Sequence, residues 1–355
     1  MAQGNSEIEI PTGGLKYPWL RLVIGVAATG IISVVAASIG SVDVPPLTIL
    51  KIIASKWPGI EIVQDWPTSF DTIVWQLRLP RIVLAGIVGA SLAVAGTTYQ
   101  GLFRNPLADP YLIGVASGAG LGATIVLVTG VPAYLNGFSL LPLASFGGAI
   151  ATVSAAYMVA RSSEGLPLTT LILAGVAIAS WTTAATTLLL LSSEPELRPV
   201  LSWLLGGFIS AQWRHTAMIL PYLAPAVFII IVYARILNVM QLTEDHAKQL
   251  GVSIERTKLL LILAASLATA SAVAFAGPIG FVGLVAPHIV RITWGVDHRS
   301  LLPMSAIAGA VMLISADLIA RTILSPGELP VGVITAFLGA PFFLFLLWQR
   351  RGLSN

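Results

Sequence analysis

Long apolar runs separated by short polar connections recur along the whole chain. A run of about 20 apolar residues is what one helix needs to cross the hydrocarbon layer of a membrane. With charged residues, Pro and Gly taken as boundaries, the chain contains ten candidate spans, at residues 19–40, 82–103, 111–130, 141–160, 168–191, 216–235, 259–277, 281–294, 303–324 and 331–349. The pattern predicts an all-α polytopic membrane protein of about ten transmembrane helices, forming a single domain over residues 1–355.

The composition excludes an ordinary soluble protein. Of the 355 residues, 56% are apolar and only 10% are Asp, Glu, Lys or Arg, whereas a typical soluble domain is about 25% charged. The mean hydropathy is +0.89. Such a chain cannot cover a water-facing surface, so we expect membrane lipid as its surroundings. The formal net charge of +3 is too small to indicate a nucleic-acid partner.

Missing residue types exclude several kinds of chemistry. The chain has no Cys and no Gly-Lys pair, so it lacks Cys-ligated metal and a phosphate-binding loop of the GxxxxGK[ST] type. The four histidines show no i, i+3 or i, i+4 pairing; they are His215, His246, His288 and His298. We therefore predict that this chain binds no metal and no cofactor. We also predict that it has no catalytic residues and is not an enzyme. ATP and Mg, if used, are bound by another chain.

The distribution of basic residues predicts the topology. An even number of spans puts both termini on one side, and basic residues favour the cytoplasm. If both termini are cytoplasmic, 12 of the 19 Lys and Arg residues lie inside. We therefore expect a cytoplasmic tail at 1–18, an outer loop at 41–80 and an inner loop at 238–258. Seven basic residues remain outside, namely Lys51, Lys56, Arg78, Arg81, Arg198, Arg214 and Arg321.

Three groups of short motifs are specific enough to point to a family. They are WQLRLPR at 75–81 with NPLADP at 105–110, GPIGFVGLVAPH at 277–288, and ELPVG at 328–332 with GAP at 339–341. In this order and spacing the chain, from about residue 15 to 350, resembles the FecCD family, which comprises permease subunits of binding-protein-dependent ABC importers for ferric siderophores, haem and vitamin B12.

This resemblance implies a fold, a function and a set of partners. The fold is that of a type II ABC importer permease in the cytoplasmic membrane of a bacterium or archaeon. The partners are a second copy of the chain, two cytoplasmic ABC ATPase subunits, and one periplasmic or lipid-anchored substrate-binding protein. The function is ATP-driven import of a large metal chelate by alternating access.

Two arginines lie at the outer end of the second predicted span. Arg78 and Arg81 flank Pro80, which favours helix initiation, and Arg321 follows Asp317 by four residues, so this second pair shares a helix face. From the residues alone, anchoring at the membrane surface is an equally good interpretation. The resemblance implies that Arg78, Arg81 and Arg321 receive acidic residues of the binding protein.

The inner loop at 238–258 contains a short predicted helix. Thr243 can cap it, Glu244 and Asp245 suit its positive end, and Gly251 suits its stop. The pattern alone also fits a solvated connection. The resemblance implies the coupling helix that contacts the ATPase, with an Ala-x-x-Leu-Gly core at Ala247, Leu250 and Gly251.

Three further residues are candidates for the inner gate. The resemblance implies that Leu107, Leu168 and Thr169 occupy positions that close the inner mouth of the pathway in the cobalamin permease of this family. Here Pro167 and Leu168 make the start of the fifth span more apolar than in that relative. A leucine at a helix end is also commonly a packing residue, so both interpretations stay open.

A different class of transporter also fits the pattern. An ion-coupled secondary transporter with an inverted repeat, here of spans two to five and seven to ten, would show similar hydropathy. Such proteins need an acid or base within a span to bind the coupling ion. Asp317 is the main candidate, although it lies near a span end beside Arg321.

Overall fold

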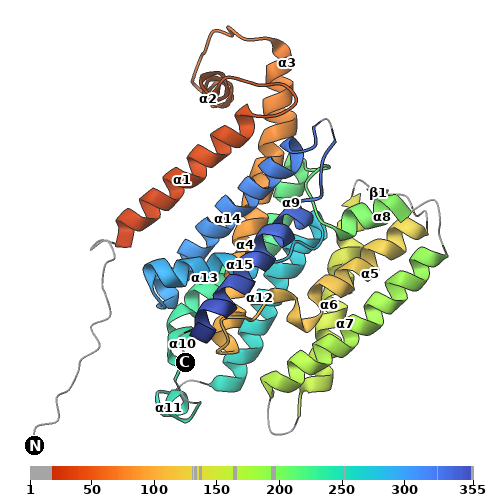
Figure 1. Ribbon diagram of the computed structural model, residues 1–355, viewed down its shortest axis with the longest axis vertical. Coiled ribbons are helices and arrows are strands. Elements are labelled where there is room, and N and C mark those ends of the chain that lie inside the picture. Colours follow the sequence, from red (N-terminus) through yellow and green to blue (C-terminus); the bar gives the residue numbers. More distant parts are fainter. Residues whose placement is uncertain are drawn as a thin grey trace, which may run out of the picture.

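A computed structural model describes residues 18–352, apart from residues 130, 132–133, 136–137, 163–165, 193–196, 243, 252 and 326. The described residues fold almost entirely into helices (Figure 1). The elements are α1 (Pro18–Ser38), α2 (Pro46–Ser55), α3 (Thr68–Asp71), η1 (Thr72–Arg78), α4 (Leu79–Leu102), η2 (Pro110–Ile113), α5 (Val115–Val128), β1 (Tyr134–Leu135), β2 (Phe138–Ser139), α6 (Leu140–Ala160), α7 (Leu168–Leu191), α8 (Leu197–Leu204), α9 (Trp213–Val232), α10 (Ala234–Val239), α11 (Glu244–Gln249), α12 (Ile254–Ala276), α13 (Val282–Trp294), α14 (His298–Thr322) and α15 (Val331–Gly352).

Each of the ten predicted apolar runs coincides with one apolar helix. These helices are α1, α4, α5, α6, α7, α9, α12, α13, α14 and α15. Within the described part of the chain, seven helical segments are long and apolar enough to cross a membrane, and α5, α13 and α15 carry shorter apolar stretches. The predicted fold class, an all-α polytopic membrane protein, is confirmed.

The second span begins earlier than predicted. Its helical segment runs continuously from Thr68 to Leu102 through α3, η1 and α4, whereas the apolar pattern indicated a start at residue 82. Residues 68–79 contain no Gly or Pro, so nothing interrupts the helix. The wider π-helical segment η1 ends two residues before Pro80, whose missing N–H removes one regular helical bond.

The centre of the molecule is formed by α4 and α12, and both helices are 72% buried over their most apolar window. Glycines bring backbones together here: a Cβ at Gly96 would overlap the carbonyl oxygen of Gly283 in α13, and Gly89 and Gly309 meet in the same way. Small residues permit such close packing of membrane helices. The peripheral helices α1 and α7 are only 17% and 22% buried, so their apolar side chains remain available to lipid.

The two ends of the bundle carry different short helices. Helix α2 lies with α3 at one end, and α11 lies at the opposite end (Figure 1). The loops predicted at 41–80 and at 238–258 therefore lie at opposite ends of the bundle (Figure 1).

Candidate docking and coupling sites

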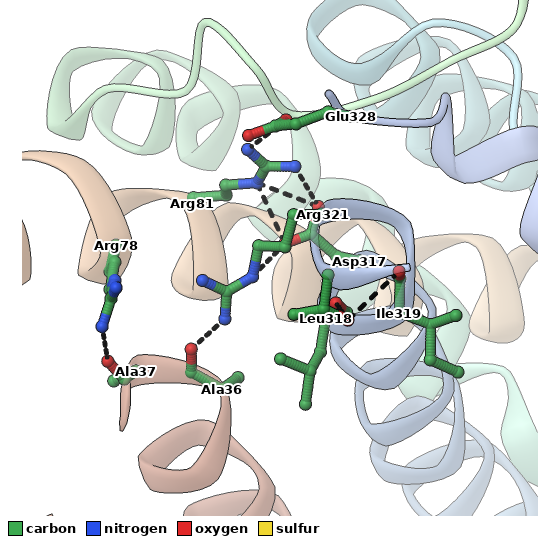
Figure 2. A network of polar contacts seen from close by, with 10 residues as sticks. Ala36, Ala37, Arg78, Arg81, Asp317, Leu318, Ile319, Arg321 and Glu328 are labelled. Carbon is green, nitrogen blue, oxygen red and sulfur yellow. Dashed lines mark hydrogen bonds and ion pairs between the residues drawn. The ribbon is translucent and has the colours of Figure 1, made fainter. Parts of the chain in front are cut away.

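An ion-pair cluster joins α4, α14 and the loop that precedes α15 (Figure 2). The Arg81 guanidinium donates through Nε and Nη2 to the Asp317 carboxylate, at 2.9–3.0 Å. Its Nη1 donates to Glu328 Oε2 at 2.8 Å. The Asp317 side chain is only 2% exposed, and a two-nitrogen contact of this kind compensates a buried carboxylate well. Arg81 therefore holds three chain segments together.

Two neighbouring arginines, Arg78 and Arg321, bind the carbonyl end of α1. Arg78 Nη1 donates to Ala37 O at 2.6 Å and to Ser38 O at 3.1 Å, and Arg321 Nη2 donates to Ala36 O. The last turn of α1 contains no basic residue, and its final carbonyls have no partners within the helix. The two arginines supply these missing donors together with positive charge that suits a helix C-terminus.

These contacts add to what the sequence suggested. Arg321 does face Asp317 four residues earlier, with Nε 3.9 Å from Oδ2, but the closer partner of Asp317 is Arg81. All three arginines have partners within the chain. The side chain of Arg81 is 11% exposed and that of Glu328 is 33% exposed, so Glu328 is the most accessible member of the Arg81 ion pairs. Sequence reasoning included Glu328 in a motif and gave it no role.

The predicted short helix of the inner loop is present as α11. It spans six residues, and Gly251 follows it with φ +79°, a conformation that suits glycine after a helix. Ala247 is buried, whereas Leu250 is 64% exposed. Residue 243 and the side chains of Glu244 and Asp245 lie outside the described residues. An exposed leucine therefore follows a short helix at this end of the molecule.

The candidate gate residues lie in the connection between α4 and α5 and at the start of α7. Leu107 lies half-buried between α4 and α5, where its N–H donates to Asn105 Oδ1 at 2.9 Å. Asp109 Oδ1 accepts from Tyr111 N at 2.8 Å, so two side-chain turns fix this connection. Leu168 and Thr169 begin α7, and Thr169 is exposed.

Burial raises the pKa of Asp109 to about 6, against the effect of its hydrogen bond from Tyr111 N. An acid whose pKa is higher in the folded state binds its proton more tightly there, so its contribution to stability is lost as the pH rises from about 4 to about 6. We expect Asp109→Asn, which keeps the oxygen acceptor, to melt at a higher temperature than the parent at about pH 7.5 and to lose this advantage at about pH 5. Thermal melts in detergent at the two pH values measure this. An advantage that does not change with pH would contradict it.

A cavity of about 500 Å³ lies beside the ion-pair cluster. Its lining includes Arg81, Trp203, Phe208, His215, Phe275 and Leu329. The lining thus combines Arg81 with aromatic and apolar side chains.

Comparison with known proteins identifies the family. The FecCD transport family matches residues 27–349. This chain belongs to the FecCD family. The motif-based resemblance is thereby confirmed, and the protein is a permease of the ABC importer type.

Individual relatives agree with this assignment along most of their length. The chain is 42% identical over 332 residues to the ABC transporter permease protein YvrB of Bacillus subtilis, which is uncharacterised, covering 93% of this chain and 94% of that protein. It is 43% identical over 301 residues to the cobalamin import system permease protein BtuC of Halobacterium salinarum, with 83% and 80% covered. It is 41% identical over 293 residues to the hemin transport system permease protein HmuU of Yersinia pestis, with 81% and 87% covered.

A solved structure has the same fold. It is described as an inward-facing conformation of a metal-chelate type ABC transporter, and it matches with a TM-score of 0.81 at 31% sequence identity. The match covers 94% of this FecCD permease and all of that chain.

Proposed function

We propose that this FecCD permease imports a large metal chelate, such as cobalamin, haem or a ferric siderophore, by ATP-driven alternating access. Two copies of the chain form the pathway, two cytoplasmic ATPase subunits bind ATP and Mg, and one substrate-binding protein delivers the chelate. The membrane is the cytoplasmic membrane of a bacterium or archaeon, and both termini are cytoplasmic. The observation that carries the proposal is the identity of 41–43% to cobalamin and hemin permeases over most of their length.

The secondary-transporter alternative is less well supported. Its coupling acid would be Asp317, and this carboxylate is already bound through two nitrogens of Arg81. A coupling ion would have to compete with a guanidinium in a buried site, where removing one ionic partner is costly.

Transport in vesicles tests the proposal against this alternative. The permease, its ATPase and its binding protein are reconstituted, and uptake of cyanocobalamin, haemin and a ferric hydroxamate is measured separately. We expect uptake of one of these to require the binding protein and Mg·ATP on the ATPase side. Uptake that persists without ATP and collapses with the proton gradient would contradict the proposal.

We further propose that the binding protein docks at the cluster of Arg78, Arg81 and Arg321. The three arginines carry three positive charges, and the carboxylates of Asp317 and Glu328 carry two negative charges. These five residues therefore have a net charge of +1. An acidic side chain of the binding protein would replace Glu328 on Arg81 Nη1, because Glu328 is its most exposed partner. The ATPase in turn contacts α11 and Leu250, which follows this helix and offers an exposed apolar side chain.

Glu328→Gln tests the docking proposal without leaving Asp317 unpaired. Replacing this carboxylate by an amide weakens its bond to Arg81 Nη1 and raises the net charge of the cluster by one, so we expect the binding protein to be captured about 3- to 10-fold more tightly. Binding to the permease in lipid nanodiscs measures this affinity.

Asp65→Asn is the matched control. It removes one exposed acid from the outer loop, where Asp65 pairs with Lys51, away from the Arg81 contacts. We expect the affinity of this variant for the binding protein to equal that of the parent. Unchanged or weaker capture by Glu328→Gln would remove the docking role from Arg81.

A further inference from the structure

The segment that leads into α11 is tied to the connection after α4. Arg104 Nε donates to the carbonyl oxygen of Met240 at 2.7 Å. Gln241 Nε2 donates to the carbonyl oxygen of Gly101 at 2.8 Å. These two bonds run in opposite directions between the same two segments, and α11 starts at Glu244. A shift of the start of α11 therefore acts directly on the connection that contains Leu107.

The backbone at Arg104 points to a use for its side chain. Arg104 has φ +49°, a left-handed conformation that glycine adopts more easily than residues with a Cβ. The residue is exposed, so packing does not require a long side chain here. Its side chain instead donates to the carbonyl oxygen of Met240. An arginine thus occupies a position that suits glycine and makes a bond that glycine cannot make.

The segment that follows α11 is tied to the start of α7. Glu255, in the first turn of α12, accepts a hydrogen bond from Leu166 N at 2.9 Å. Its other carboxylate oxygen lies 3.4 Å from Lys258 Nζ, which holds the side chain in place. Leu166 is buried and stands two residues before Leu168, where α7 begins. A bond to a charged acceptor is stronger than one between neutral groups.

The two flanks of α11 are therefore joined to two different inner connections. We propose that Arg104 and Glu255 are positioning residues that pass movement of α11 to the two parts of the inner gate separately. Arg104 acts on the connection that carries Leu107, and Glu255 acts on the start of α7 with Leu168 and Thr169. This inference rests on the proposed function, in which the ATPase moves α11.

Site-specific labelling can follow each part of the gate, because the natural chain has no Cys. Leu107→Cys and Thr169→Cys are made separately, and the permease is assembled with its ATPase in nanodiscs. The rate of modification by a hydrophilic maleimide is measured without nucleotide and with Mg·ATP plus vanadate. We expect nucleotide to change the rate at each position by about five-fold or more.

The tether variants are then added to each labelled protein. Arg104→Gly, which suits the local backbone, should abolish the nucleotide response at Leu107→Cys and leave that at Thr169→Cys. Glu255→Ala should do the reverse. Glu255→Gln should retain both responses, because its amide oxygen can still accept from Leu166 N. Arg235→Ala, a control for loss of an exposed basic residue on α10, should also retain both.

The outcome at the two positions decides the proposal. Selective loss supports two separate connections, and restored response in Glu255→Gln excludes a simple effect of altering that site. Retention of both responses in Arg104→Gly and Glu255→Ala would overturn the inference, as would loss of both responses in each variant. If the parent proteins bind the ATPase and respond at neither position, the proposed gating function fails first, and this inference fails with it.

Discussion

Arg81→Ala is expected to lower the free energy of unfolding by about 3 to 5 kcal/mol, because it leaves a buried carboxylate without its main partner. Asp317 is 2% exposed and receives two nitrogens of Arg81. Arg321, the remaining cation, has its Nε 3.9 Å away and donates through Nη2 to the end of α1. The yield of monodisperse protein and its thermal melting in detergent measure the loss.

Two further variants separate the buried charge from the loss of a side chain. Arg81→Leu combined with Asp317→Leu removes both charges, and replacing a buried pair by apolar residues is often close to neutral. We therefore expect the double variant to be more stable than Arg81→Ala. Arg198→Ala, at an exposed position of α8, should change little. A single variant as stable as the parent would show that Asp317 does not depend on Arg81.

Gly96→Ala is expected to destabilise the protein by about 3 kcal/mol or more, because overpacking against backbone cannot be relieved by a rotamer change. The added Cβ would overlap the carbonyl oxygen of Gly283, so α4 and α13 would have to separate. Both helices belong to the buried part of the bundle. Thermal melting and the monodisperse yield again measure the effect.

Gly147→Ala provides the matched comparison in another apolar helix. Among the described residues, apart from its chain neighbours and the adjacent backbone of α6, no atom lies within 4 Å of a Cβ built at Gly147. Alanine is the better helix former by about 1 kcal/mol, so this variant should equal or exceed the parent in stability. If both substitutions were tolerated equally, α4 and α13 would not be in backbone contact.

Local features of the sequence predicted the local structure well. The ten apolar runs became ten helices because a membrane helix depends mainly on apolar length, which the sequence states directly. The short helix α11 was predicted from residues within nine positions of one another, since helix starts and stops are local. The predicted start of the second span, at residue 82, was wrong. The polar residues of 68–79 suggested a loop, although no Gly or Pro in this segment breaks the helix.

Contacts between distant segments could not be predicted in the same way. Asp317 and Arg321 were recognised as a pair because they are four residues apart on one helix. Arg81 is 236 residues from Asp317, and only the packing of α4 against α14 brings them together. The bonds from Arg104 to Met240 and from Glu255 to Leu166 N also have a backbone group at one end, and a backbone acceptor or donor leaves no signature in the sequence.

The binding of Arg321 to the end of α1 has a consequence for biosynthesis. The two residues of this contact are 285 positions apart, and α1 is the least buried of the long apolar helices. At ribosomal speeds of about 5 to 20 residues per second, α1 enters the bilayer about 15 to 60 seconds before its partner has been translated. During that interval the newly inserted N-terminal helix can contact only lipid and the helices already translated. Its packing against α14 is completed close to the end of translation.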